Sequence, residues 1–254
     1  MAGEGAGALQ IERVPCLQDN YSWLVHEPAH NLTAVVDPAE VSPVLKALEA
    51  KNWKLTHIFN THHHWDHTGG NAELKERFAC TVVGPDADKA RIPGIDVALK
   101  DGETYQFGAA QMHVFDTPGH TRGHITLWFP GAKVLFPGDT LFALGCGRLF
   151  EGTPQQMWTS LSKLIPLPPE TQSNAKFAVH ADPDNEELRK RKAEIDDLRS
   201  KGVPTVPSLL GQELRTNPFL RPDESAIRKA LGIPEGASSW EAFGKIRQAK
   251  DSFR

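Results

Sequence analysis

Short apolar runs separated by turn residues fill the first two thirds of the chain. Runs rich in Val, Ile, Leu, Phe and Trp predict strands, and helical spacing of apolar side chains between some of them predicts helices. The predicted strands cover 9–14, 21–26, 33–37, 56–60, 81–84, 111–117, 124–129 and 133–137. The predicted helices cover 41–52, 71–78 and 154–165. Strands and helices therefore alternate in two similar halves, which predicts an α/β fold of two mixed sheets packed face to face with helices outside.

The last third of the chain has a different pattern. From about Asn185 the sequence becomes charged and helical (ELRKRKAEIDDLRSK), continues with VPTVPSLLGQELRTNPFLRP and ends in a helix that closes with KIRQAKDSFR. We expect an α/β domain over 9–172 and an α-helical domain over 173–254. One element is missing from the alternation, because LPPETQ runs directly into polar, helix-like SNAKFAVHADPDNEEL where another strand is expected.

Composition narrows the class of protein. The 254 residues are 39% hydrophobic and 24% charged, which is typical of a soluble globular chain, and no apolar run is long enough to cross a membrane. A net charge of −4 offers no excess of cations for phosphates, so a nucleic-acid partner is not expected. Cys16, Cys80 and Cys146 show no CxxC spacing, which excludes a thiolate zinc motif and favours a reducing compartment. The first segment has no leader-like pattern, so we expect a cytoplasmic protein. A monomer is also expected.

The candidate chemistry is concentrated in THHHWDHTGGN, at 61–71, directly after a predicted buried strand. Alternate side chains of an extended backbone share a face, so His62 and His64 can converge on one metal while the residues between them point away. Asp66 and His67 then face a second position. A polar loop with chance histidines is the plain alternative, and so dense a cluster at a strand end argues against it.

Two more segments offer donors at the ends of predicted strands. His120 lies in DTPGHTRGH, where a Pro-Gly turn would aim an imidazole out of the sheet edge, and Asp139 lies in LFPGDTLF. Either residue alone would be interpreted as a turn residue. Because both follow predicted strands, we interpret them instead as candidate metal ligands. His124 is interpreted as a loop-stabilising residue. Four histidines are interpreted as surface or packing residues: His26, His30, His57 and His113.

These motifs resemble the metallo-β-lactamase superfamily, whose HxHxDH pattern begins here at His62. Within it, the chain resembles the glyoxalase II (hydroxyacylglutathione hydrolase) family through GDTLFALGCGRLFEGT and the tail segments PTVPSLLGQELRTNPFLR and RQAKDSF. The resemblance runs from about Gln10 to Phe253, and its tail segments are the selective ones. It implies an αββα sandwich followed by a C-terminal helical domain.

The resemblance implies two divalent metals. The first would be held by His62, His64 and His120, the second by Asp66 and His67, with Asp139 bridging both. Such ligands suit zinc, iron or manganese. The implied reaction is hydrolysis of S-D-lactoylglutathione to D-lactate and glutathione, the second step of methylglyoxal detoxification. Asp66 and Asp139 are its candidate catalytic residues, and no cysteine is assigned as a nucleophile.

The resemblance also implies a clamp for the glutathione carboxylates, formed by Arg148, Arg247 and Lys250. Arg247 and Lys250 are three residues apart and share a helix face; without the family they would be read as a solvated basic helix end. Phe150 stands where many members carry Tyr, so a hydroxyl contact to the substrate is absent. Gly147 is expected to serve a backbone turn.

The missing strand bears on the second metal. In the family this place holds a strand-length stretch of about ten residues ending in Gly-His-Glu-Tyr, whose His completes the second site and whose Tyr helps bind glutathione. We therefore expect an internal deletion between Gln172 and Ser173 and weaker binding of the second metal. His180 is the nearest histidine and matches a helical position of the family rather than the ligand. Two alternatives stay open: a mononuclear iron enzyme similar to persulfide dioxygenases, and a non-catalytic binding variant.

Overall fold

The computed structural model describes residues 8–18, 20–173, 181–182 and 184–252. The chain divides into two compact units. The first comprises Met1–Asp116 and Gly123–Ala132, and the second comprises Thr117–Arg122 and Lys133–Arg254. His180 lies outside the described residues. Among the described residues, no helix combines the length and the apolar character needed to cross a bilayer.

The first unit contains a sheet of six strands in the order of the chain. These are β1 (Gln10–Cys16), β2 (Asn20–Glu27), β3 (Leu32–Val36), β4 (His57–Phe59), β5 (Thr81–Pro85) and β6 (Val97–Leu99). The first three strands pair antiparallel, and β3 to β6 pair in parallel. Because β3 and β4 are parallel neighbours, the residues that follow them meet at one edge of the sheet.

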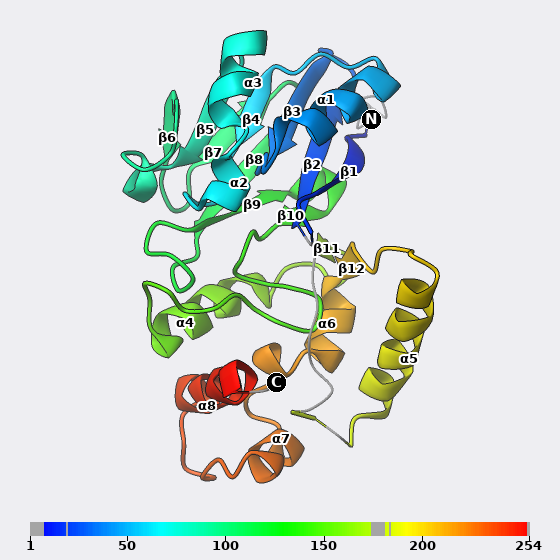
Figure 1. The fold of residues 1–254 in the computed structure, drawn as a ribbon. Helices are drawn as coiled ribbons and strands as arrows, with labels where there is room; N and C mark the ends of the chain where they lie inside the picture. The colour runs from blue at the N-terminus through cyan, green and yellow to red at the C-terminus, as the bar shows by residue number, and fades with distance from the viewer. Residues whose placement is uncertain (1–7, 19, 174–180, 183, 253–254) are drawn as a thin grey trace, which may run out of the picture. The chain divides into compact units, whose positions relative to one another are not determined.

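Helices cover one face of this sheet (Figure 1). They are α1 (Val41–Lys51), α2 (Trp65–Thr68) and α3 (Asn71–Phe78), with a short 3-10 turn, η1, at Asp86–Asp88. Apolar side chains of α1 and α3 pack with those of the strands into one core that includes Val44, Leu48, Leu74, Ile58 and Val82. The predicted helices 41–52 and 71–78 are therefore confirmed, and burial of their apolar faces explains them.

The other face of the sheet meets three antiparallel strands. They are β7 (Thr104–Phe107), β8 (Ala110–Asp116) and β9 (Ile125–Phe129). Phe59 on β4 contacts Phe107 at a ring-centroid distance of 5.3 Å and Phe129 at 6.4 Å. Aromatic packing of this kind joins the two sheets, as the sandwich prediction requires.

The second unit has short strands and several helices. Its strands are β10 (Val134–Phe136), β11 (Gln172–Ser173) and β12 (Ser208–Leu209), and its helices are α4 (Pro154–Leu164), α5 (Glu186–Ser200), α6 (Leu210–Thr216), η3 (Pro218–Leu220), α7 (Ser225–Ala230) and α8 (Ser239–Ser252). A capping box at Thr153 with Gln156 begins α4, which packs along α8 through Trp158 and Phe243.

The position of the expected missing strand holds a strand of two residues. Gln172 pairs with Val134 of β10 in parallel, and β11 pairs with both residues of β12 antiparallel. The prediction that no strand forms here was thus too strong, although β11 is much shorter than the usual five or so residues. The two residue pairs that β11 forms with β12 are enough to define a short strand.

The histidine motif changes conformation along its length. Extended backbone was predicted for His62 and His64, and residues from Trp65 to Thr68 form the helix α2. His64 retains an extended conformation (φ −60°, ψ 147°) and serves as the N-cap. The chain therefore changes from extended to helical between the first two candidate ligands and the next two, which turns the second pair in a new direction.

Candidate metal centre

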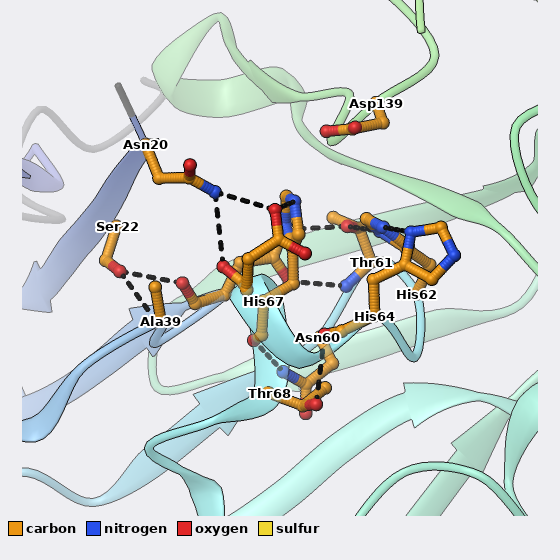
Figure 2. Close-up of polar contacts among 12 residues, drawn as sticks. Asn20, Ser22, Ala39, Asn60, Thr61, His62, His64, His67, Thr68 and Asp139 are labelled. Carbon is orange, nitrogen blue, oxygen red and sulfur yellow. Dashed lines mark hydrogen bonds and ion pairs between the residues drawn. The ribbon is translucent and has the colours of Figure 1, made fainter. Parts of the chain in front are cut away.

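His62 and His64 converge after β4, as their alternating spacing predicts. The strand is anchored by Ile58 and Phe59, which are fully buried. His62 Nε2 lies 3.1 Å from His64 Nδ1, and the two rings are 4.7 Å apart (Figure 2). Two imidazole nitrogens this close, on a rigid strand end, are suited to share one metal ion.

The helix α2 brings Asp66 and His67 into the same region. The ring of His67 contacts that of His62 in a tilted arrangement at a centroid distance of 4.1 Å, and His67 Nε2 lies 3.6 Å from Asp66 Oδ2. Both residues belong to the first turn of the helix, so their side chains start from adjacent backbone positions. An imidazole nitrogen and a carboxylate oxygen at this separation form the second half of a donor group.

Asp37 is a functional residue that the sequence analysis missed. It follows β3 and is buried, with its Oδ1 accepting from the Thr61 backbone N–H (2.8 Å) and its Oδ2 accepting from Thr61 Oγ1 (2.7 Å). The same Oδ2 lies 3.1 Å from His67 Nδ1. A carboxylate only accepts, so His67 donates through Nδ1 and its Nε2 carries the lone pair. The available signal was an Asp directly after an apolar strand parallel to the one before the motif.

The residues between the ligands point elsewhere. His63 Nδ1 lies 2.8 Å from the buried carboxylate of Asp88, which also pairs with Arg91. Trp65 is 70% exposed. His124, predicted to stabilise a loop, is buried and stacks on His62 at 4.9 Å. These neighbours hold the motif in place rather than extend its donor set.

The second unit carries the other two candidate ligands. His120 Nε2 lies 3.3 Å from Asp139 Oδ2, while His120 Nδ1 lies 2.7 Å from the carbonyl oxygen of Arg148. A carbonyl only accepts, so His120 donates through Nδ1 and presents Nε2 toward the carboxylate. A Cβ on Gly147 would lie 2.1 Å from the Asp139 carbonyl oxygen, so this approach of two loop segments requires glycine.

The predicted glutathione clamp occupies two environments. Burial lowers the pKa of Lys250 below its usual range, and the nearby charges of Arg247 and Arg148 lower it further. Arg247 is buried: its guanidinium donates to the Cys146 carbonyl oxygen (2.9 Å), pairs with Asp251 (2.8 Å) and lies 5.1 Å from the Phe219 ring centre. The three cations are therefore grouped, with Arg247 committed to the protein interior.

Phe150 is the most accessible of the predicted substrate residues. It is 63% exposed, and its ring centre lies 5.2 Å from that of His120. An exposed aromatic ring beside a candidate ligand is suited to contact an organic substrate. The side chain offers no hydroxyl, in agreement with the sequence.

The donors of the first unit fit a divalent metal. In the first unit, donor atoms of Asp37, His62 and His67 all lie within 4.8 Å of one another, and all three residues are buried. Clustered neutral imidazoles and carboxylates without thiolates suit zinc, iron or manganese. Asp37 is already engaged by Thr61 and His67, so we interpret it as the residue that orients the ligands.

Comparisons with known proteins extend this picture. Residues 18–175 match the metallo-beta-lactamase superfamily, and residues 170–253 match the hydroxyacylglutathione hydrolase C-terminus. A hydroxyacylglutathione hydrolase of Methylococcus capsulatus is 54% identical, with 97% of this chain and 99% of that protein covered. Another, of Ruegeria pomeroyi, is 48% identical, with 96% and 99% covered.

The chain belongs to the hydroxyacylglutathione hydrolase family. The family and the fold predicted from the motifs are thereby confirmed. Among solved structures, ETHE1 from Myxococcus xanthus aligns with a TM-score of 0.68 at 25% identity, covering 96% of this chain and 92% of that one. TTHA1623 in a di-iron-bound form aligns with a TM-score of 0.61 at 25% identity, covering 82% and 98%.

The same comparison supports a shortened chain. The alignment with the Methylococcus capsulatus protein runs over 255 positions but spans 97% of these 254 residues, about 246, so about nine positions of the relative have no counterpart here. The expected deletion of a strand-length stretch would account for a total of this size. The two-residue β11 lies where the motif analysis places that deletion.

Proposed function

We propose that this chain is a metal-dependent thioester hydrolase that cleaves S-D-lactoylglutathione to D-lactate and glutathione. The observation that carries the proposal is 54% identity to a hydroxyacylglutathione hydrolase over nearly the whole of both chains. The family match of residues 170–253 supports the hydrolase over the persulfide dioxygenase alternative, because this match covers the helical tail.

The proposed division of labour follows the two family matches. We assign catalysis to 9–172 and glutathione binding to 173–254. The match of 18–175 to the superfamily and of 170–253 to the hydrolase C-terminus supports a boundary close to β11. The three cysteines are free and buried, which fits a reducing compartment such as the cytoplasm.

The family match supports two metal positions built from the donors described above. We assign His62, His64 and His120 to the first metal, Asp66 and His67 to the second, and Asp139 to both. Asp37 holds His67 in the tautomer that presents Nε2, and the Arg148 carbonyl does the same for His120. When bound, such a metal lowers the pKa of a water molecule to about 7 and polarises a carbonyl group.

The chain's own residues then position the substrate. Arg148 and Lys250 are placed to attract the glutathione carboxylates, and Phe150 provides an apolar contact. Water adds to the thioester carbonyl, the C–S bond breaks, and the electron pair leaves on sulfur as glutathione thiolate. A thiol has a pKa near 8.5, so departure needs no strong general acid. This explains why no cysteine or histidine nucleophile is required.

The test is an assay of the purified, metal-loaded chain with S-D-lactoylglutathione, in which thiol release is recorded. Turnover is expected, and His64→Ala should reduce it by at least a hundredfold because one metal loses a ligand. His113→Ala is the matched control, since His113 lies on β8 and contacts Gln111 and Trp128, neither of which is a candidate ligand. It should leave turnover within twofold.

Two results would contradict the proposal. A chain that takes up metal and releases no thiol would show that the shortened strand has abolished hydrolysis. Oxygen uptake that depends on glutathione persulfide, with iron bound and no thioester cleavage, would instead favour the dioxygenase.

A further inference from the structure

Asn20 connects the first hairpin of the chain to the candidate metal centre. It is the first residue of β2, and its side-chain amide reaches the N-terminal turn of α2, 46 residues further along the chain. Asn20 Nδ2 donates to Asp66 Oδ2 at 3.0 Å and to the Asp66 carbonyl oxygen at 3.3 Å (Figure 2). One amide group therefore holds both the side chain and the backbone of a candidate ligand.

The contact fixes the direction of the Asp66 carboxylate. Asp66 Oδ2 lies 3.6 Å from His67 Nε2, the nitrogen that carries the lone pair because Nδ1 donates to Asp37. Asn20 and Asp37 thus act on the two adjacent ligands from different strands. Asn20 donates to the same Asp66 oxygen that lies 3.6 Å from His67 Nε2, and Asp37 accepts from the opposite ring nitrogen of His67.

Such a tether matters because Asp66 is not held by burial. Its side chain is 30% exposed, and it lies in a helix of four residues. An unrestrained side chain on a short helix would sample several rotamers, and ordering it would oppose cation binding. The amide of Asn20 removes this freedom before any cation arrives.

We propose that Asn20 is a positioning residue that preorganises Asp66 and His67 for the second metal ion. This inference rests on the proposed function, since it takes those two residues as ligands of that metal. The family resemblance implies that a histidine ligand of this second site is missing from the chain, so the site would depend on fewer protein groups. Orientation of the remaining ligands accordingly has a large effect on whether that site is occupied.

The experiment measures metal binding rather than turnover. Metal-free full-length chain is titrated with Co²⁺ against a competing chelator, and visible absorption follows the two equivalents separately. Asn20→Ala should weaken the second equivalent by about 10 to 100-fold and change the first by less than threefold. Asn20→Asp, which places a carboxylate against that of Asp66, should weaken the second equivalent at least as much.

Ser22→Ala is the matched control. Ser22 lies on the same strand and donates to the Asp37 carbonyl oxygen (2.7 Å), but it contacts neither Asp66 nor the ring of His67. It should lower the melting temperature without altering the ratio of the two Co²⁺ affinities. A side-chain NMR signal of Asn20 in the metal-free chain should shift in Asp66→Ala, which verifies the contact independently of any metal.

Three outcomes would overturn the inference. The first is a wild-type chain that takes up only one equivalent at millimolar Co²⁺. The second is an equal loss of both affinities in Asn20→Ala, which would indicate a purely structural tether. The third is an unchanged second affinity. Each leaves thioester hydrolysis to be judged by its own assay, so failure of this inference is distinct from failure of the proposed function.

Discussion

The two units position their candidate ligands by different means. In the first unit, His62 follows β4, and Asp37 follows the parallel neighbour β3, so regular strand pairing brings them together. In the second unit, His120 and Asp139 lie on loops, and the strands of that unit comprise three, two and two residues. Regular backbone pairing supports the first group, whereas the second needs another source of order.

That source is a buried polar network centred on Glu213 of α6. Its Oε2 accepts from the Leu144 backbone N–H (2.7 Å) and from Asn217 Nδ2 (3.1 Å), while its Oε1 accepts from Ser208 (2.7 Å) and pairs with the buried Arg191. Asn217 in turn donates to two carbonyl oxygens of the loop that follows Asp139. The comparison teaches that a loop-built site can be ordered by side chains where strands are too short.

The largest effect is expected from breaking this network. Glu213→Ala leaves the buried guanidinium of Arg191 without its partner and the Leu144 N–H without its acceptor, so we expect about 3 to 5 kcal/mol lower stability. Urea unfolding would measure it. Glu235→Ala, on an exposed loop, is the control. A loss below about 1 kcal/mol would mean that the network does not order the loop.

Asp37→Asn tests the first unit by the same logic. An amide in place of the carboxylate no longer compels His67 to donate through Nδ1, so the wrong tautomer can form at the ligand. We expect stability to fall by about 1 to 3 kcal/mol and metal affinity by about 10 to 100-fold. Asp88→Asn is the control, because Asp88 forms an equivalent bond to His63, which is not a ligand. Equal loss of metal affinity in both variants would contradict this role.

Gly147→Ala tests the loop of the second unit by steric means. The added Cβ would lie 2.1 Å from the Asp139 carbonyl oxygen and 3.0 Å from His120 Nδ1, so the backbone beside both ligands must shift. We expect at least about a tenfold loss of turnover, or about 1.4 kcal/mol. Gly236→Ala, where a Cβ meets nothing within 4 Å, should be silent. Full activity of Gly147→Ala would show that the loop backbone can shift without affecting turnover.

The sequence predicted the features that depend on local patterns and missed those that depend on distant residues. The strand before the motif and the convergence of His62 and His64 are local patterns, and both are present in the structure. Asp37 was missed because its partners lie 24 and 30 residues away and a single Asp after a strand resembles a turn residue. The helix α2 was missed because a four-residue helix is too short to show periodicity.

Burial of charged residues was the least predictable feature. Arg191 belongs to the charged helical sequence, which suggests a solvated surface, yet it is buried as a pair with Glu213. Arg247 and Lys250 were predicted to share one helix face toward a ligand, but Arg247 is buried against the Cys146 carbonyl. Helical spacing fixes the direction of a side chain but does not say what covers it, since the covering segments are distant in sequence.

Lys250 offers a smaller effect that depends on pH. Burial, together with Arg247 and Arg148, lowers its pKa, so its charge is lost at a lower pH than that of an ordinary lysine. In the proposed role, the charged form of Lys250 attracts the substrate carboxylate, so KM should rise as pH rises through this lowered pKa, while kcat stays constant. Lys250→Met should raise KM severalfold, or about 1 kcal/mol, and remove the pH dependence. Lys250→Arg should keep KM low across the range, and an unchanged profile in Lys250→Met would exclude Lys250 as the titrating group.

The smallest expected effect concerns the thiol of Cys146, which lies in the loop that follows Asp139. Complete burial raises the pKa of Cys146 to about 12, so its reactive thiolate is much scarcer than that of an exposed cysteine. Burial also raises the pKa of Cys80 in the first unit. Iodoacetamide should therefore leave the native chain unlabelled and active at pH 8, and should label all three cysteines in urea. Rapid labelling of native Cys146, identified by mass spectrometry, would show that its loop opens to solvent and that the network around Glu213 does not hold the second unit's site closed.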